Sequence, residues 1–325
     1  MSANSHHAAQ CTGCGICVLP CPAWWNTHDI FVTPHGILRA LQGHARARDL
    51  KDTLFHCSMC GACEPVCPEK IDILAVFHNL RGELPSPALS SPQQTPAPDA
   101  RPDQAAKAAS RRLFLPGPQL PKHDTLLKRV LESLGATASI ALSCDDGHDL
   151  ALALELGAPI NSRRAKQFTA QFHMAHELIV VEGILHRFLR QSCPHLQVTG
   201  LAEALLQVDG IRQSLKPNDL LVIDARGFHA DHDRVVKVFD RIRQKTGCQM
   251  NLDLQRLAIP TSSDATAGNG ADLESIRATA IEWMLRGRQV DRIVVESPLD
   301  IRVFETHTST PVVHLAELSN EVVCA

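Results

Sequence analysis

Two cysteine runs of identical spacing lie near the N-terminus, and they constrain the fold more than any other feature of the chain. The first run covers residues 11–22 and the second covers residues 57–68, and each reads C-x2-C-x2-C-x3-C-P. Three thiolates at this spacing can wrap one loop around three irons of a cubane cluster, while the fourth points away and reaches another cluster. The spacing therefore predicts two [4Fe–4S] clusters that exchange their fourth ligands.

The exchange of ligands assigns every cysteine of the two runs to one cluster. Cys21 and Cys67, the last cysteines of their runs, are each expected to bind the cluster held by the other run. Pro22 and Pro68 follow them and help to turn the chain away, because proline fixes φ and has no N–H to donate. The first cluster is expected on Cys11, Cys14, Cys17 and Cys67, and the second on Cys57, Cys60, Cys63 and Cys21.

Zinc and disulfide bonds are the alternative uses of so many cysteines. Structural zinc sites favour pairs of C-x2-C motifs, not a run of four cysteines that occurs twice. Disulfides form in oxidising compartments, and the first ten residues lack the basic and apolar segments of a signal peptide. The other cysteines, Cys144, Cys193, Cys248 and Cys324, are scattered without metal spacing. We therefore expect an iron–sulfur protein of the reducing cytoplasm.

Length and charge narrow the class of protein further. A chain of 325 residues has room for about two domains, and a hydrophobic fraction of 44% is ordinary for a globular core. The formal net charge of −3 argues against a nucleic-acid-binding protein, which usually carries a basic excess. No run approaches eighteen apolar residues, so we expect no membrane span, and any membrane association would be peripheral, through a partner.

Residues 1–82 are expected to form an all-helical ferredoxin domain. Helices are predicted to start at Ile37 and at Asp49, and a further helix is predicted from Leu74 to Leu80. Trp24 and Trp25 follow the first run directly; we expect them to shield a cluster and fill the core, with a docking anchor for a partner as the alternative.

Residues 83–111 have the composition of a linker. Six prolines are interleaved there with Ser, Gln, Ala and Asp, which is typical of a semi-extended tether that cannot bury a core. Such a tether would let the two halves of the chain move relative to each other.

The C-terminal half contains an internal repeat. The sequence IVVE at residues 179–182 recurs at 293–296, and LAE at 201–203 recurs at 315–317, so both pairs are offset by 114 positions. Matching offsets over separated segments indicate a tandem duplication. In both copies short apolar runs alternate with amphipathic stretches, which predicts parallel α/β sheets. We expect two such lobes, at residues 112–215 and 216–325, related by a pseudo-two-fold axis. Strands are expected at residues 113–115, 139–142, 178–181, 220–223 and 292–295.

Residues 11–80 resemble the helical ferredoxin module of the heterodisulfide reductase C/D and glycolate oxidase iron–sulfur subunit group. The matching stretches are CTGCGICVLPCP, TPHGILRAL and LFHCSMCGACEPVCPEKIDI. The two C-terminal copies resemble, in number and order, the duplicated cysteine-rich CCG domain of the same families. The resemblance implies an electron-transfer subunit between a flavin-containing dehydrogenase, or related oxidoreductase, and a quinone-linked or other redox protein.

The C-terminal half departs from the CCG pattern at nearly every motif. In those families, cysteines from both copies bind a further iron–sulfur cluster or form a disulfide-handling site, whereas here Cys144 is the one candidate left. We therefore expect a degenerate, cluster-free scaffold that binds partners, with Arg226 paired to Asp300 or Glu182 in the freed pocket. The motif positions are occupied by Gly117-Pro118, Ser143-Cys144, Glu182, Leu185, Arg226, Ser297 and Asp300.

Two other functions remain open from the sequence. One is a catalytic reductase, heterodisulfide-reductase-like or acting on a small molecule, that uses Cys144, Arg226 or His229 in the C-terminal lobes. The other is an assembly or maturation factor that delivers or senses clusters. His229 and His232 follow an expected strand end, where sites of α/β proteins lie, but a solvated helix N-terminus capped by aspartate is the favoured interpretation there.

The paired runs predict the iron content of the protein. Purified without oxygen, the chain is expected to carry about eight irons and eight sulfides, all bound within residues 11–67. Because the fourth ligand crosses over, Cys21→Ser should damage the cluster of the second run more than that of its own run. Iron analysis near four or near twelve per chain would contradict the prediction.

Overall fold

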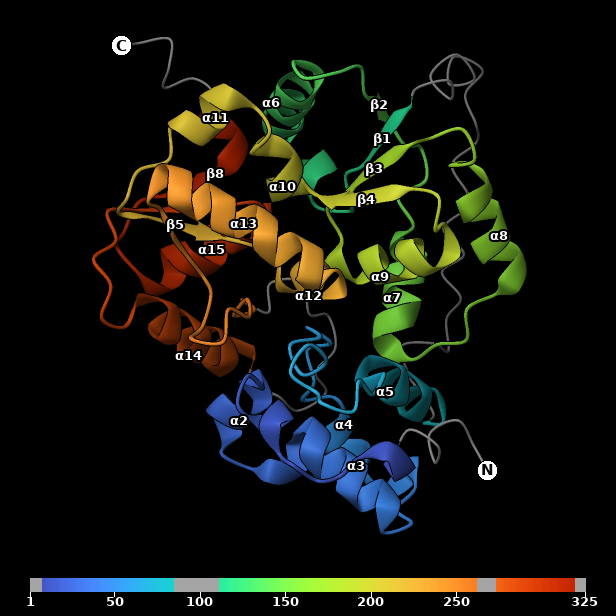
Figure 1. Cartoon of the computed structure of the whole chain (residues 1–325). Coiled ribbons are helices and arrows are strands. Elements are labelled where there is room, and N and C mark those ends of the chain that lie inside the picture. Colours follow the sequence, from blue (N-terminus) through green and yellow to red (C-terminus); the bar gives the residue numbers. More distant parts are fainter. Residues whose placement is uncertain (1–7, 85–110, 262–272, 319–325) are drawn as a thin grey trace.

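The computed structural model describes residues 8–84, 111–261 and 273–318. A helical domain built from the N-terminal residues is followed by two α/β lobes, each with a four-stranded parallel sheet (Figure 1). The predicted fold class, an all-α ferredoxin-like domain before two parallel-sheet lobes, is therefore confirmed. Most of the predicted linker and Cys324 lie outside the described residues.

The helical domain consists of short helices that begin at clear signals in the sequence. Pro22 and Pro34 stand at the first position of their helices, where proline is tolerated because its missing N–H has no partner there. Thr33 caps the second of these helices, since its hydroxyl accepts from the Gly36 N–H at 3.3 Å. The elements are η1 (Ile16–Val18), α2 (Pro22–Thr27), η2 (Ile30–Val32), α3 (Pro34–Gln42), η3 (Ala47–Asp49), α4 (Lys51–Leu54) and α5 (Ile73–Gly82).

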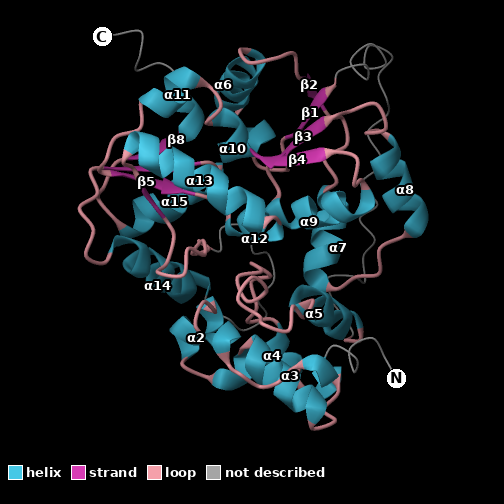
Figure 2. Ribbon diagram, in the orientation of Figure 1, coloured by secondary structure: helices cyan, strands magenta, loops and turns pink. Residues whose placement is uncertain are grey.

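The first lobe has its sheet in the order β2-β1-β3-β4, with every neighbouring pair parallel (Figure 2). Its central strands β1 and β3 are apolar and buried, as parallel strands covered on both faces must be. The elements are β1 (Arg112–Leu115), η7 (Leu120–Lys122), α6 (Asp124–Gly135), β2 (Ala141–Leu142), α7 (His148–Leu156), α8 (Ser162–Ala170), β3 (Glu177–Val180), α9 (Gly183–Ser192), β4 (Gln197–Gly200), α10 (Leu201–Leu205) and α11 (Asp209–Gln213).

The second lobe repeats this arrangement with the order β6-β5-β7-β8, again parallel throughout. The strands expected at residues 220–223 and 292–295 are β5 and β7, the central pair of this sheet. The elements are β5 (Asp219–Val222), α12 (Ala225–Ala230), α13 (His232–Thr246), β6 (Gln249–Met250), α14 (Leu273–Leu285), β7 (Arg292–Val295), α15 (Pro298–His307) and β8 (Val312–His314).

An ion pair marks the equivalent position in the two sheets. Arg112 and Glu177, the first residues of β1 and β3, are paired in register and joined at 2.6 Å. Asp219 and Arg292, the first residues of β5 and β7, are likewise in register and joined at 2.7 Å, with the two charges exchanged. The same place in each sheet thus holds one partly buried pair, which supports the predicted duplication.

The strand register corrects one detail of the repeat. With Glu177 equivalent to Arg292, the offset between β3 and β7 is 115 positions, so the IVVE match is one residue out of register. Pairing of the outer strands makes Gly200 equivalent to His314, so the LAE match at an offset of 114 is in register. The two sequence matches therefore cannot both be structural equivalences, because an apolar run such as IVV aligns equally well when it slips by one residue.

The helical domain and both lobes share buried surfaces. One core cluster combines Phe114 of the first lobe with Phe228 and Val294 of the second, and it includes Cys60 and Ala62 of the second cysteine run. In Figure 1 the segment that carries this run rises between the lobes from the helical domain below. The halves are thus packed together in spite of the linker that the sequence predicts between them.

Backbone contact between α5 and the loop after α7 requires glycine. Gly157 has a φ of +77°, and a Cβ on it would lie 2.5 Å from the His78 carbonyl oxygen and 2.6 Å from the Gly82 nitrogen. Glycine is the residue that adopts this left-handed conformation without a steric penalty. The close approach holds the helical domain against the first lobe.

Gly157→Ala is expected to destabilise the protein more than a left-handed φ alone would. Gly287 offers a matched control, because its φ is +70° and nothing lies within 4 Å of its Cβ position. Gly287→Ala should cost about 1–2 kcal/mol for the conformation, and Gly157→Ala about 1–3 kcal/mol more for the overlap. Urea unfolding of both variants measures the difference, and equal losses would show that the interdomain contact is not tight.

Candidate iron–sulfur site

The first thiol group consists of Cys11, Cys14, Cys17 and Cys67. Burial, and after it the charges of Cys11, Cys14 and Cys67, raise the pKa of Cys17 to about 12. The thiols of the first run therefore lie within electrostatic range of the last cysteine of the second run. Cys14 is exposed, so this group reaches the protein surface.

The second thiol group consists of Cys57, Cys60, Cys63 and Cys21. Burial raises the pKa of Cys63 well above its usual value, and Glu64 and the other three thiols of the group contribute. Burial also raises the pKa of Cys21, with Cys57 and Cys60 as its charged neighbours. Cys21 therefore lies within electrostatic range of two thiols of the second run.

The donor set of both groups fits an iron–sulfur cluster. Iron is bound by thiolates, and the high pKa values of crowded, buried thiols mean that they ionise only when positive charge is supplied. Left-handed turns bring the two loops around their thiols: Gly13, Gly15 and Gly61 have φ near +77°, and Met59 has φ of +56°. The Met59 N–H also donates to the Cys57 sulfur at 3.4 Å.

Arg81 of α5 forms hydrogen bonds with the backbone at the start of the second run. The residue is 1% exposed, and its guanidinium donates to the carbonyl oxygens of Leu54 at 2.8 Å and Cys57 at 2.6 Å. A third bond joins it to the Glu155 carbonyl oxygen of α7 at 2.6 Å. One buried cation therefore ties the helical domain to the first lobe.

Arg226 of α12 reaches the same loop from the second lobe. Its guanidinium donates to the Ser58 carbonyl oxygen at 2.8 Å and to the Glu155 carboxylate at 3.1 Å. The expected ion pair of Arg226 with Asp300 or Glu182 is thus replaced by a pair with Glu155, and both side chains are more than nine-tenths buried. Burial raises the pKa of Cys57, while Arg81 and Arg226 lower it.

His229 is a structural contact of the second run. Its Nδ1 lies 2.8 Å from the Cys60 carbonyl oxygen, and its Nε2 accepts from the Ala258 N–H at 3.1 Å. Because a backbone N–H can only donate, the ring proton must be on Nδ1 and donates to Cys60. Burial lowers the pKa of His229 to about 4, so the ring is neutral. The expected solvated helix N-terminus is wrong for this residue, since the docked cysteine loop covers it.

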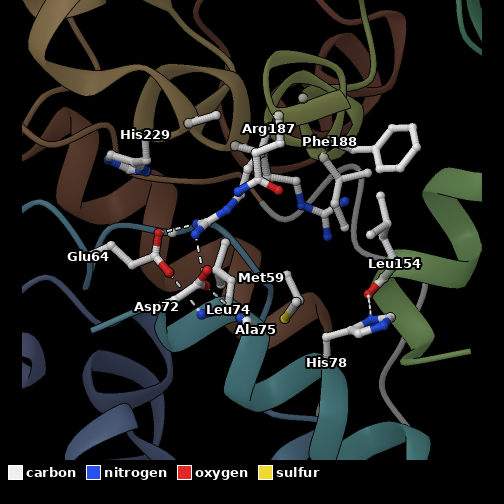
Figure 3. Close-up of a pocket in the computed structure, with 16 residues that line it drawn as sticks. Met59, Glu64, Asp72, Leu74, Ala75, His78, Leu154, Arg187, Phe188 and His229 are labelled. Carbon is white, nitrogen blue, oxygen red and sulfur yellow. Dashed lines mark hydrogen bonds and ion pairs between the residues drawn. The ribbon is translucent and has the colours of Figure 1, made fainter. Parts of the chain in front are cut away.

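A pocket of about 160 Å³ lies beside the second cysteine loop (Figure 3). At one end Arg187 of α9 pairs with Glu64 and, at 2.8 Å, with Asp72. At the other end the His78 ring lies 3.0 Å from the Leu154 carbonyl oxygen. The lining is otherwise mainly apolar, from Met59, Leu74, Ala75, Leu154, Ile184 and Phe188.

The paired tryptophans contact different parts of the chain. Trp25 stacks on Trp283 of α14, with ring centroids 5.5 Å apart, so it joins the helical domain to the second lobe. Trp24 packs in a small cluster with Cys21, Ala23 and Val32. Trp24 therefore fits the expected shielding role, and Trp25 is an anchor within the chain.

The side chains at the C-terminal positions where the resemblance implies cysteines differ in chemical character. Cys144 is exposed after β2, and Cys193 is buried before a turn. Ser297 caps α15, since its hydroxyl oxygen accepts a hydrogen bond from the Leu299 N–H. Its neighbours Glu296 and Asp300 are buried. Sequence analysis did not identify Arg81, Glu155 and Arg187 as site residues, because none of them belongs to a motif. The one signal that could have identified them is a charged residue on an otherwise apolar helix face.

Comparison with known proteins identifies one module. The family described as 4Fe-4S dicluster domain matches residues 7–71, which covers the helical domain up to the start of α5 and neither lobe. No curated protein and no solved structure matches the chain. The N-terminal module is thus an iron–sulfur, ferredoxin-like domain. Among the helices that the structure describes, none is long and apolar enough to cross a membrane.

Arg226→Gln is expected to destabilise the docked second run. Breaking a buried ion pair costs about 3–5 kcal/mol, because a charge stays buried without its partner. Glu155→Gln added to the same chain should recover part of the loss. The measurement is urea unfolding of the iron-loaded protein, together with its iron content.

Arg190→Gln provides the control for this substitution. Arg190 lies on α9 and pairs with Asp231 at 3.0 Å, but its side chain is 42% exposed. An exposed pair contributes about 0–1 kcal/mol. Equal losses for the two variants would contradict a buried clamp at Arg226.

Proposed function

We propose that the chain is an iron–sulfur electron-transfer subunit with two [4Fe–4S] clusters. It relays electrons between a partner oxidoreductase, flavin-containing by resemblance, and a further redox protein. The observation that carries this proposal is the pair of crossed thiol groups within a domain that matches the dicluster family. When bound, such clusters accept and release single electrons over a wide range of potentials.

Two sets of four thiolates would hold the clusters in this proposal. Cys11, Cys14, Cys17 and Cys67 form the surface site, and Cys57, Cys60, Cys63 and Cys21 form the enclosed one. Fourth ligands that cross between the runs keep the sites adjacent within one small domain. Electrons can therefore enter at one side of the helical domain and leave at the other.

The C-terminal lobes act in this proposal as a scaffold that encloses the second thiol group. Arg81, Arg226 and His229 donate to the carbonyl oxygens of Cys57, Ser58 and Cys60, respectively. These bonds fix the loop and exclude water from its outer side. Positive guanidinium groups beside the loop also favour thiolates there.

A partner is proposed to dock over the first thiol group. Four large apolar side chains of the helical domain are exposed, on η1, the following turn and η2, and η1 includes Cys17 of the first group. Exposed apolar side chains are typical of protein interaction sites when they form a patch. The four are Ile16 at 39% exposure, Leu19 at 58%, Ile30 at 41% and Phe31 at 65%.

The pocket beside the second loop favours one other candidate function, a small-molecule reductase. Pockets with apolar walls and a few fixed polar groups are the usual sites of small ligands. Here the walls come from α5, α7, α9 and α12, and Met59 and Gly61 of the cysteine loop complete them. Turnover of a small molecule by the isolated chain with a chemical reductant would favour this function over the relay.

Isolation of the native complex tests the relay. The untagged chain, purified without oxygen, should bring a redox enzyme with it, and substrate of that enzyme should reduce the chain. Phe31→Ser and Leu19→Ser should slow this reduction tenfold or more, since hot-spot residues contribute about 1–4 kcal/mol to binding. Leu254→Ser is the control, because Leu254 is fully exposed and lies in the second lobe. Equal effects of all three substitutions would contradict docking at the first group.

A further inference from the structure

Two buried carboxyl groups lie at the ends of the central strands of the second lobe. Asp224 follows β5 and Glu296 follows β7, and ligand sites of parallel sheets form at this edge. A cavity of about 30 Å³ separates them from Ser58 and Cys60 of the second cysteine run. A second cavity of about 20 Å³ lies on their other side and reaches His186. Each cavity has room for a water molecule.

Backbone hydrogen bonds hold the two carboxyl groups in place. Glu296 accepts from the Asp224 N–H at 2.5 Å and from the Ala202 N–H at 2.7 Å, so it bridges the two lobes. Asp224 accepts from the Gly227 N–H at 2.5 Å. Burial, and then the charge of Asp224, raises the pKa of Glu296 to about 8, and burial raises that of Asp224. The pair thus carries a proton near neutral pH.

His186 of α9 lines the second cavity. The residue is 1% exposed, and neither ring nitrogen has a hydrogen-bond partner within the described part of the chain. Buried polar groups are nearly always paired, and the adjoining cavity leaves water as the available partner. Burial lowers the pKa of His186 to about 3, with Arg234 and Arg190 contributing. A neutral ring has one donor and one acceptor, so it can pass a proton along.

We propose that Asp224 and Glu296 form a proton-binding site that takes up one proton when an electron reaches the second thiol group, with His186 and Glu203 leading to solvent. Glu203 lines the same cavity as His186, and its carboxylate pairs with Arg234, whose side chain is 36% exposed. The inference rests on the proposed function, since it requires a cluster on the second group.

Charge balance is the physical reason for the coupling. One electron from a reduced donor is added at the second group, and one proton from water forms an O–H bond on a carboxylate oxygen of the pair. Oxidation reverses both transfers, so the buried region keeps its net charge. An uncompensated charge in such surroundings is costly, and the proton removes that cost.

Other charged and polar groups also face the pair. Arg226 on α12 stays cationic, and Asp300 on α15 contributes negative charge to Glu296. The His314 ring of β8 lies 2.9 Å from the Glu296 carbonyl oxygen, and burial lowers the pKa of His314 to about 4. Glu182, before α9, raises the pKa of Asp224. Thr261 and Ser297 complete the lining with neutral hydroxyls.

A redox titration of the iron-loaded full chain at several pH values tests the proposal. Glu296 ionises in the oxidised protein above pH about 8, so reduction takes up a proton only above that pH. The potential of the second cluster should be flat below it and fall above it, by up to about 59 mV for each tenfold drop in proton concentration. Glu296→Gln should flatten the upper part of this curve, while Glu305→Gln, an exposed change on α15, should not.

Two outcomes separate the inference from the function on which it rests. A chain without iron would overturn the proposed function. A chain with both clusters and a potential independent of pH, or a slope that Glu296→Gln leaves unchanged, would overturn the proton site alone. Should Glu296→Gln fail to fold, difference infrared spectroscopy of the wild-type chain reads the same event. Reduction above pH about 8 must then produce the band of a protonated carboxyl group.

Discussion

Burial of the second thiol group is the constraint on which the rest of the structure depends. Four thiols enclosed by protein ionise only beside positive charge. Arg81 of the helical domain supplies one cation and Arg226 of the second lobe another, while His229 reaches the same loop and Glu155 of the first lobe joins Arg81 to Arg226. The contacts of Arg81, Arg226 and His229 go to backbone carbonyl oxygens of the loop. The second run is thus the place where helical domain and both lobes meet.

The two sheets share one architecture although the residues at their strand ends differ. Strand order, direction and a partly buried ion pair at the same register position recur in both lobes. At the strand ends, where the resemblance implies cysteines, the chain has carboxylates, serines and an arginine. A parallel sheet requires apolar central strands and permits wide variation in the loops at its carboxyl edge. The same fold therefore has charged and hydroxyl side chains at this edge, where the resemblance implies cysteines.

Sequence-based prediction was most accurate for features that depend on residues close together in the chain. Cysteine spacing dictates how a loop can wrap a cluster, and apolar runs located β1, β3, β5 and β7 to within a residue at either end. The edge strand β4, which starts with Gln197 and ends at Gly200, has no such run and was missed. The ion-pair partner predicted for Arg226 was wrong, because its actual partner Glu155 lies 71 positions away in the sequence. The two side chains come together only when the two lobes pack against each other. His229 is buried for the same reason, since the loop that covers it comes from another domain.

The two thiol groups differ in their surroundings, and this difference bears on how electrons are distributed between them. In the proposed relay, enclosure of the second group disfavours the added negative charge of a reduced cluster, which would lower the reduction potential of that cluster relative to one on the exposed first group. Two guanidinium groups and the Nδ1–H of His229 act in the opposite direction, because they stabilise negative charge on the loop. Their positions are fixed by the lobes and not by the helical domain alone. The lobes therefore determine the balance between the two sites, even though the cysteines themselves all lie in the N-terminal module.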